Sequence, residues 1–352
     1  MKRALIVLAV AAAAVLISIP GASFYYESGG GENCARCHEI RPAVDLWKSS
    51  SHRNVACSAC HGDAFTLSPD FHLTNLRRVR AHLSGEVPDQ PRLGDAMIPA
   101  IMARCESCHR NEAAAWRGGP HAVTYETLFL DPKHNRERQL MDDCLRCHGM
   151  HFEGSIADLV TPIDHQGPWK LKDPARAKRP AIPCLTCHSI HQTGRPQPLR
   201  DRQRVSSKGE DVLRPSLGLF DRRSLRTISL RNLPLPRVLD GERPVKMSPD
   251  PRQALCYQCH APLAHPQAGS GDDRTPLGVH EGLSCAACHE RHKQTTRASC
   301  ANCHPRLSNC NRDVETMDTT FFDPKSKRNV HWVKCADCHP KGVPPRKPRP
   351  VD

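Results

Sequence analysis

One five-residue pattern, Cys-x-x-Cys-His, occurs nine times in this chain of 352 residues and accounts for 18 of its 19 cysteines. Two thiols three residues apart can form thioethers with the two vinyl groups of one porphyrin, and the histidine that follows then lies under the iron as an axial ligand. The pattern therefore predicts nine covalently attached c-type haems, each with its iron. The predicted haem-binding cysteines are Cys34, Cys37, Cys57, Cys60, Cys105, Cys108, Cys144, Cys147, Cys184, Cys187, Cys256, Cys259, Cys285, Cys288, Cys300, Cys303, Cys335 and Cys338.

Other uses of paired cysteines fit this chain less well. Zinc ribbons and thiol–disulfide enzymes also carry Cys-x-x-Cys, but neither has a reason to place histidine directly after every pair. A disulfide framework would not confine its cysteines to one spacing. Only Cys310 stands outside the pattern. We expect it to be an inert thiol rather than a ligand or a nucleophile.

The chain is poor in the residues that build an ordinary core. Aromatic residues make up 5% of it and hydrophobic residues 38%, and its mean hydropathy is −0.55. Nine haems leave about 39 residues for each, so the porphyrins must supply much of the buried apolar surface. We expect short α-helices and irregular coil wrapped around stacked haems, with minimal β-structure and two haem lobes.

The formal charge of +13 does not indicate a nucleic-acid partner. Two propionates on each of nine haems, balanced by one positive charge on each ferric haem core, bring the net charge to about +4. Many lysines and arginines are thus expected to neutralise propionates. We expect no nucleic acid among the partners.

The N-terminal segment, residues 1–23, has the features of an export sequence. Lys2 and Arg3 precede an apolar run at 4–19, and small residues near Ser23 permit cleavage after it. The alternative is a retained membrane anchor, with the aromatic residues at 24–26 at the membrane interface. Both alternatives place the rest of the chain outside the cytoplasm, in the periplasm or on the outer surface.

The spacing of the motifs predicts the domain organisation. Five motifs lie before residue 194 and four lie after residue 251, and the stretch between them is haem-free and rich in arginine and proline. Within it, residues 225–230 weakly indicate a strand. The expected parts are a five-haem lobe at 24–194, a linker or strap at 195–250, a four-haem lobe at 251–340 and a disordered basic tail at 341–352.

The nine motif histidines are the expected first axial ligands of the irons, and twelve further histidines could supply the second. The motif histidines are His38, His61, His109, His148, His188, His260, His289, His304 and His339. Seven others stand three residues after a motif, just before a motif, or five residues after a tryptophan. These predicted distal ligands are His52, His121, His151, His191, His280, His292 and His331.

The remaining histidines are weaker candidates for the second axial position. His72, His82 and His134 lie on polar stretches that we expect to be helical, and a solvated surface residue is the alternative for each. His165 and His265 lie in segments rich in proline and glycine and are the least favoured.

The repeated motif and its appended histidines resemble the multihaem c-type cytochrome superfamily. The first 60 residues are also similar to membrane-anchored NapC/NirT-type cytochromes, which pass quinol electrons to periplasmic reductases. The similar features are the apolar N-terminus, the Cys34–His38 motif, the Trp47–His52 segment and the Cys57–His61 motif. This second resemblance covers under a fifth of the chain, and it implies a quinol as the electron donor. The chain departs from it in having nine motifs rather than four or five, and in having no methionine closely after His38.

A haem with histidine on both faces has no open site for a substrate and can only change its oxidation state. We therefore expect a nonahaem electron carrier in an extracytoplasmic respiratory chain rather than an enzyme. Its expected partners are redox proteins, such as a quinol dehydrogenase, a terminal reductase or other cytochromes, with membrane association through the N-terminus.

Two rival readings stay open. One is a multihaem terminal reductase of a small nitrogen or sulfur oxyanion with one open-coordination haem. Several such enzymes carry lysine in place of the motif histidine, and no Cys-x-x-Cys-Lys occurs here. The other rival is a haem-bearing subunit of a filament or outer-surface complex.

Overall fold

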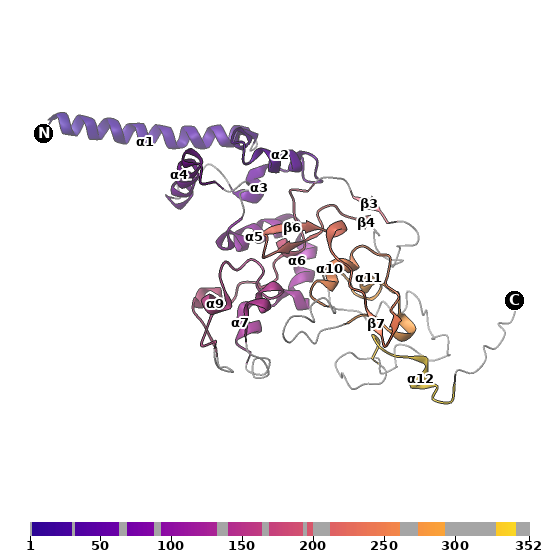
Figure 1. Ribbon diagram of the computed structural model, residues 1–352. Helices are drawn as coiled ribbons and strands as arrows, with labels where there is room; N and C mark the ends of the chain where they lie inside the picture. The colour runs from indigo at the N-terminus through magenta and orange to yellow at the C-terminus, as the bar shows by residue number, and fades with distance from the viewer. Residues whose placement is uncertain are drawn as a thin grey trace. The chain divides into compact units, whose positions relative to one another are not determined.

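The computed structural model describes residues 2–29, 32–62, 69–87, 93–131, 140–163, 169–192, 196–199, 212–260, 274–292 and 329–342. Short helices and very short strand pairs are joined by long irregular segments (Figure 1). The expected class of short α-helices and coil with minimal β-structure is thus confirmed for the part of the chain described. The predicted tail lies almost wholly outside these residues.

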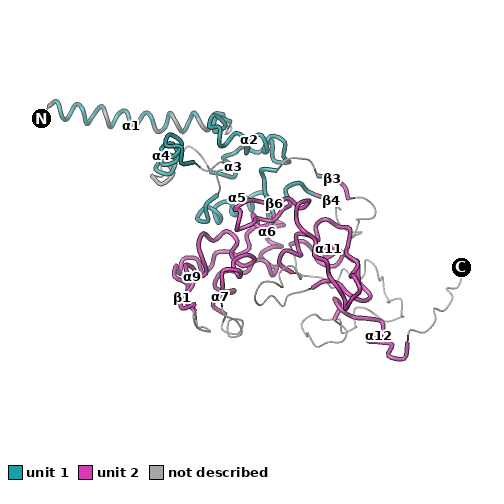
Figure 2. The backbone as a smooth tube through the Cα atoms, viewed as in Figure 1, with its two compact units in different colours: residues 1–110, 188–196, 214–216 teal, residues 111–187, 197–213, 217–352 magenta. Residues whose placement is uncertain are grey.

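The chain forms two compact units (Figure 2). Unit 1 contains residues 1–110, 188–196 and 214–216, and unit 2 contains residues 111–187, 197–213 and 217–352. These units divide the chain at other places than the expected lobes at 24–194 and 251–340. The reason is that segments distant in sequence pack together within unit 2: the Gly218 N–H donates to the Cys187 carbonyl oxygen.

Unit 1 is helical, and three of its helices carry all or part of a motif. Its elements are α1 (Lys2–Ser28), η1 (Glu32–Arg36), α2 (Arg41–Lys48), α3 (Cys57–His61), α4 (Pro69–Ser84), η2 (Asp95–Met97) and α5 (Ile98–Cys108). Both α2 and α5 have proline in the first turn, where its missing N–H would have no helical partner. Short helices with such starts place a motif at a defined turn without needing a large core.

Helix α1 is apolar along nearly its whole length. Its stretch Arg3–Tyr25 has 23 residues with a mean hydropathy of 2.5, and none of the window is buried. It is the one helix in the described residues that is long and apolar enough to cross a membrane. An export sequence near an N-terminus has the same properties, so both sequence alternatives fit this helix.

Unit 2 combines short helices with four two-stranded antiparallel sheets. Its helices are α6 (Arg110–Arg117, which begins at the boundary), η3 (Pro120–Ala122), α7 (Tyr125–Phe129), η4 (Asp142–Arg146), α9 (Ile156–Leu159), η5 (Pro174–Arg176), η6 (Cys184–Thr186), η8 (Leu230–Asn232), α10 (Gln253–Tyr257), η10 (Gly278–His280), α11 (Cys285–Cys288) and α12 (Cys335–Cys338). Its strand pairs are β1–β2 (Val160–Thr161, Lys170–Leu171), β3–β4 (Gln197–Pro198, Val212–Leu213), β5–β6 (Gly218–Asp221, Arg226–Ser229) and β7–β8 (Leu239–Asp240, Arg243–Pro244). Strand β6 confirms the weak strand prediction at 225–230.

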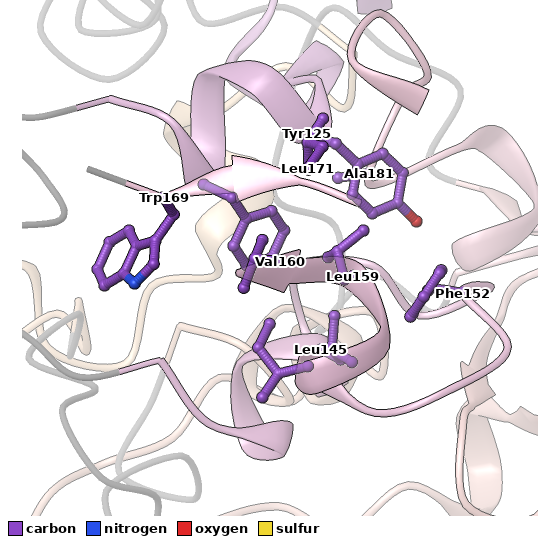
Figure 3. Close-up of a cluster of buried hydrophobic side chains, with 10 residues drawn as sticks. Tyr125, Leu145, Phe152, Leu159, Val160, Trp169, Leu171 and Ala181 are labelled. Atoms are coloured by element: carbon purple, nitrogen blue, oxygen red, sulfur yellow. The ribbon is translucent and has the colours of Figure 1, made fainter. Parts of the chain in front are cut away.

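The larger hydrophobic cluster of unit 2 lies around η4, which carries the first cysteine of a motif. Figure 3 shows side chains from η4, α9 and the β1–β2 pair gathered in one cluster. Leu145 and Leu159 are 0% and 1% exposed, and Phe129 of α7 is 2% exposed. This packing fixes η4 and hence the position of Cys144, which packs against the cluster.

A second cluster joins the haem-free segment to a motif helix. Leu219 of β5, Leu230 and Leu233 are buried with Met150 and with Ala254 of α10. Strand β5 pairs with β6 over four residues, which is the longest ladder in the described chain. The segment expected to be a linker or strap therefore packs against α10 and helps to position Cys256 within that helix.

Charged side chains hold the β7–β8 hairpin against two motif-bearing segments. Arg243 makes two contacts with the Glu281 carboxylate at 2.7 and 2.8 Å, just before α11. The Lys334 ammonium donates to Asp240 at 3.0 Å, one residue before Cys335. The Arg243 guanidinium, followed by the Lys246 backbone N–H, holds the pKa of Glu281 down at about 2.

Replacement of Leu159 by alanine should destabilise the holoprotein by about 2–5 kcal/mol, because the vacated volume lies in a closed core. The measurement is a chemical unfolding curve followed by far-ultraviolet circular dichroism. Leu239→Ala is the matched control, because Leu239 is 52% exposed and should cost within about 0.5 kcal/mol. Equal losses for the two variants would contradict the core assignment.

Replacement of Glu281 by glutamine should lower stability at neutral pH and should have no effect in strong acid. The carboxylate has a lower pKa in the folded chain than its ordinary value of 4.5, so its contribution is full above pH 4.5 and is lost as the pH falls towards 2. Unfolding midpoints of wild type and E281Q from pH 7 to pH 2 test this. Glu242→Gln, at an exposed neighbouring position, is the control and should have the same unfolding midpoint as the wild type at every pH. A difference in midpoint between E281Q and the wild type that persists at pH 2 would contradict the predicted role of the Glu281 carboxylate.

Candidate functional site

Eight of the nine motifs lie within the described residues, and each sits on or beside a helical turn. The turns are η1, α3, the end of α5, η4, η6, α10, α11 and α12. The motif at 300–304 and Cys310 lie outside the described residues. The sequence predicts such a turn because cysteines three residues apart project from one face of a helix.

One backbone hydrogen bond closes most of these turns. The N–H of the motif histidine donates to the carbonyl oxygen of the first cysteine at 2.8–3.0 Å in five motifs. These five are the motifs ending at His109, His148, His260, His289 and His339. The bond fixes the histidine beside the two cysteines, as attachment of one porphyrin by two thioethers and an axial nitrogen requires. None of the sixteen described motif cysteines forms a disulfide.

Five motif histidines each lie opposite a histidine from outside the motifs. The pairs, with the distance between ring centroids, are His38–His82 at 5.3 Å, His109–His52 at 6.1 Å, His61–His191 at 6.0 Å, His260–His121 at 6.0 Å and His289–His331 at 6.1 Å. The first three pairs lie in unit 1 and the last two in unit 2. Four of the partners belong to the seven distal candidates, and the fifth, His82, belongs to the weaker group.

These distances fit an iron held between two imidazoles. An imidazole nitrogen bonds a transition metal at about 2 Å, so ligands on opposite faces place their ring centroids about 6 Å apart once the ring radii are added. Four pairs have separations of 6.0 or 6.1 Å, and each includes the histidine of a Cys-x-x-Cys-His turn. The residues present therefore suit haem with two histidine ligands at these four positions.

Burial favours the neutral form of the paired imidazoles, which is the form that binds a metal. It lowers the pKa of five of them: His52, His61, His121, His191 and His289. The facing histidine lowers the pKa further at three positions, where His109 acts on His52, His191 on His61 and His260 on His121. Protonation of both facing imidazoles would place two positive charges close together in a partly buried site, which is unfavourable in free energy.

Backbone and amide oxygens orient two of the candidate ligands. Nδ1 of His280 lies 3.1 Å from the carbonyl oxygen of Val330, and Nδ1 of His331 lies 3.3 Å from Oδ1 of Asn329. Such a bond to Nδ1 leaves Nε2 as the nitrogen available to a metal. The Trp47 indole N–H donates to the carbonyl oxygen of Val55 at 3.1 Å and so closes the loop that carries His52.

The pair of His38 and His82 differs from the other four, because a carboxylate lies beside it. Oε1 of Glu39 is 2.5 Å from Nδ1 of His82 and 3.2 Å from Nε2 of His38. A hydrogen bond from its own backbone N–H, and then the two histidines, lower the pKa of Glu39. The three residues form a possible metal-ligand group in the described chain and line a pocket of about 240 Å³ with Gly85 and Val87.

Two further predicted ligands make other contacts in the described chain. His151 stacks on Phe220 with ring centroids 4.0 Å apart, and burial lowers the pKa of His292, which lies near His121. His72 lies on α4, as predicted, but its side chain is not described. The motif histidine His304 and the candidates His134, His165 and His265 lie outside the described residues.

Four motifs converge in unit 2. The sulfur atoms of Cys147 and Cys259 lie close together, and so do those of Cys256 and Cys285. Cys187 lies near both cysteines of the motif at 256–260. Four haem-attachment motifs therefore have cysteines that lie close together within unit 2.

Sequence reasoning missed a buried ion pair between two of these motifs. Asp250 is 1% exposed and Arg252 is 7% exposed. The Arg252 guanidinium donates to both Asp250 oxygens at 2.8–3.1 Å, and the Ser284 hydroxyl donates to Oδ2 at 2.8 Å. Ser284 in turn accepts the Ala286 N–H and caps α11. A serine directly before the motif at 285 is a capping pattern that could have indicated part of this arrangement.

Comparisons with known families agree with this geometry. Residues 104–189 match the family described as cytochrome c554 and c-prime, and residues 243–305 match the family described as cytochrome c7 and related cytochrome c. No curated protein and no solved structure matches significantly. Each matched segment contains three of the nine motifs. The chain is therefore a multihaem c-type cytochrome, which binds haem covalently and transfers electrons.

Proposed function

We propose that this protein is a nonahaem electron carrier of an extracytoplasmic respiratory chain, in which most irons have two histidine ligands. The observation that carries the proposal is the set of histidine pairs with ring centroids about 6 Å apart. Each bound haem supplies a one-electron couple at its iron. The protein's part is to fill both axial positions, to exclude substrates from the irons, and to hold the groups close together.

Five distal ligands follow from the pairs: His82 for the site of His38, His52 for that of His109, His191 for that of His61, His121 for that of His260 and His331 for that of His289. None of these ligands comes from the same motif as its partner. His191 stands three residues after the motif at 184–188, so one short segment serves two sites. This exchange between motifs would hold neighbouring haems close together within each unit.

The N-terminus supports a membrane-attached position outside the cytoplasm. Lys2 and Arg3 stand at one end of the apolar helix α1, and positive residues favour the cytoplasmic side of a membrane. The motifs all follow the opposite end. We propose redox proteins as partners, with an electron donor in the membrane and other cytochromes or a terminal reductase as acceptors.

Replacement of His121 by alanine should convert one of nine haems from low-spin to high-spin, because the iron at His260 loses its second imidazole. Ferric electron paramagnetic resonance and cyanide titration measure this, and mass spectrometry checks that all haems remain attached. His265→Ala is the control, because the sequence places that residue among the least favoured ligands. An H121A spectrum identical to that of the wild type would contradict the assignment of His121 as the second ligand at the site of His260.

The wild-type spectrum decides between the carrier and a terminal reductase. A carrier should show low-spin haems that nitrite, hydroxylamine and cyanide leave unchanged. A high-spin haem that binds nitrite or hydroxylamine would instead favour the reductase, and a count below nine would contradict the reading of the motifs.

The buried pair of Asp250 and Arg252 should shift haem potentials with opposite signs. Asp250→Asn leaves a buried cation near the sites of Cys256 and Cys285 and should raise their reduction potentials, whereas Arg252→Gln leaves a buried anion and should lower them. Each should also cost about 3–5 kcal/mol of stability. Potentiometric titration of both variants tests this, with Glu126→Gln, which removes an exposed carboxylate paired with Lys178, as the control that should change little. Shifts of the same sign in both variants would show structural damage alone.

A further inference from the structure

Helix α4 (Pro69–Ser84) presents an apolar stripe to solvent. Leu73, Leu76, Val79 and Leu83 are 49%, 65%, 53% and 80% exposed. They stand three or four residues apart and so lie on one side of the helix. Four large aliphatic side chains on one exposed helix face need a partner, because soluble surfaces rarely carry contiguous apolar patches.

The described contacts of α4 with the rest of unit 1 lie near the C-terminal end of the helix. His82 contacts the Glu39 carboxylate, and Ala81 is half-buried. His82 lies across the helix from Leu73, but it is three residues from Val79 and so shares a side with the C-terminal part of the stripe. Leu73 and Leu76, in the first half of the stripe, therefore lie away from the contact that α4 makes with the site at His38.

Arginines border the stripe. Arg77 and Arg80 lie at its edge, Arg78 lies further round, and all three are exposed. An apolar face flanked by arginines is the pattern of a helix that lies in the plane of a membrane, with its aliphatic side chains among the acyl chains and its cations at anionic headgroups.

The contacts of α1 place this helix near the same membrane. The Asn33 amide donates to the carbonyl oxygen of Tyr25 at the end of α1, at 2.5 Å, and the Arg36 guanidinium lies 5.2 Å from the centre of the Tyr25 ring. The motif that contains Arg36 also carries His38, and the next residue, Glu39, contacts α4. One motif thus links the end of the candidate membrane span to α4, all within unit 1.

We propose that α4 is an in-plane membrane helix that docks on an anionic lipid surface through Leu73, Leu76, Val79 and Leu83. It holds the site of His38 against the membrane that α1 enters. Docking of α4 adds a second attachment to the membrane and fixes which side of the cytochrome faces it. This inference goes beyond electron transfer and does not depend on the number or ligation of the haems.

Site-specific photo-crosslinking of the full-length holoprotein tests the proposal. The photoreactive residue p-benzoylphenylalanine replaces Leu76 in one variant and Thr74, an exposed residue on another side of α4, in the matched control. Both are placed in nanodiscs of phosphatidylethanolamine and phosphatidylglycerol and irradiated. Mass spectrometry should find lipid adducts at position 76 and few or none at position 74. Absence of lipid adducts at 76, equal yields at both positions, or crosslinks from 76 to protein would overturn the proposal.

A second comparison tests whether the arginines beside the stripe contribute to lipid binding. The double substitution Arg77→Gln and Arg80→Gln in the Leu76 crosslinking variant should reduce lipid adducts on the order of tenfold in the anionic discs, and should have little effect in discs of phosphatidylcholine. A yield that does not fall in anionic discs would overturn the headgroup contact. Haem spectra recorded on every sample separate a failure of this inference from a failure of the proposed carrier function, because α4 docking leaves the irons unchanged.

Discussion

The closed Cys-x-x-Cys-His turn is the constraint on which the rest of the structure depends. Its backbone hydrogen bond, at 2.8 Å in the turn ending at His109, holds two thiols and an imidazole together over five residues. A turn of this size needs little support from neighbouring structure. The chain can therefore repeat it many times, with short helices and irregular segments between the copies.

Support for these turns comes from small packed clusters and from buried charge rather than from one large core. Leu145 anchors the turn of Cys144, and the β5–β6 pair packs on the helix of Cys256. Asp250 connects the segments of Cys256 and Cys285 through Arg252 and Ser284. A buried ion pair contributes little net stability, but removal of one partner is costly, so such a pair mainly fixes geometry and local potential.

Facing histidines give the second level of organisation. The pairs join motifs that are far apart in sequence, as with His61 and His191 or His260 and His121. Burial and the facing imidazole both favour the neutral ring. The neutral ring is also the form that would bind an iron between the two histidines. The proposed coordination by two histidines, together with the converging attachment sites, would favour electron transfer over catalysis.

The sequence by itself determined the local chemistry: the motif turns, the abundance of second histidines, the apolar N-terminal helix and a fold with little regular structure. These are contained in a few neighbouring residues, and hydrophobic pattern and ligand spacing report them directly. Which histidine faces which was decided by tertiary structure, because His191 reaches His61 through contacts between segments 130 residues apart. The same holds for Glu39 beside His82 and for the Asp250–Arg252–Ser284 contacts, whose partners no spacing rule connects. The outward direction of the apolar face of α4 was also settled there, since an amphipathic pattern shows that a helix has two faces but not which one the protein covers.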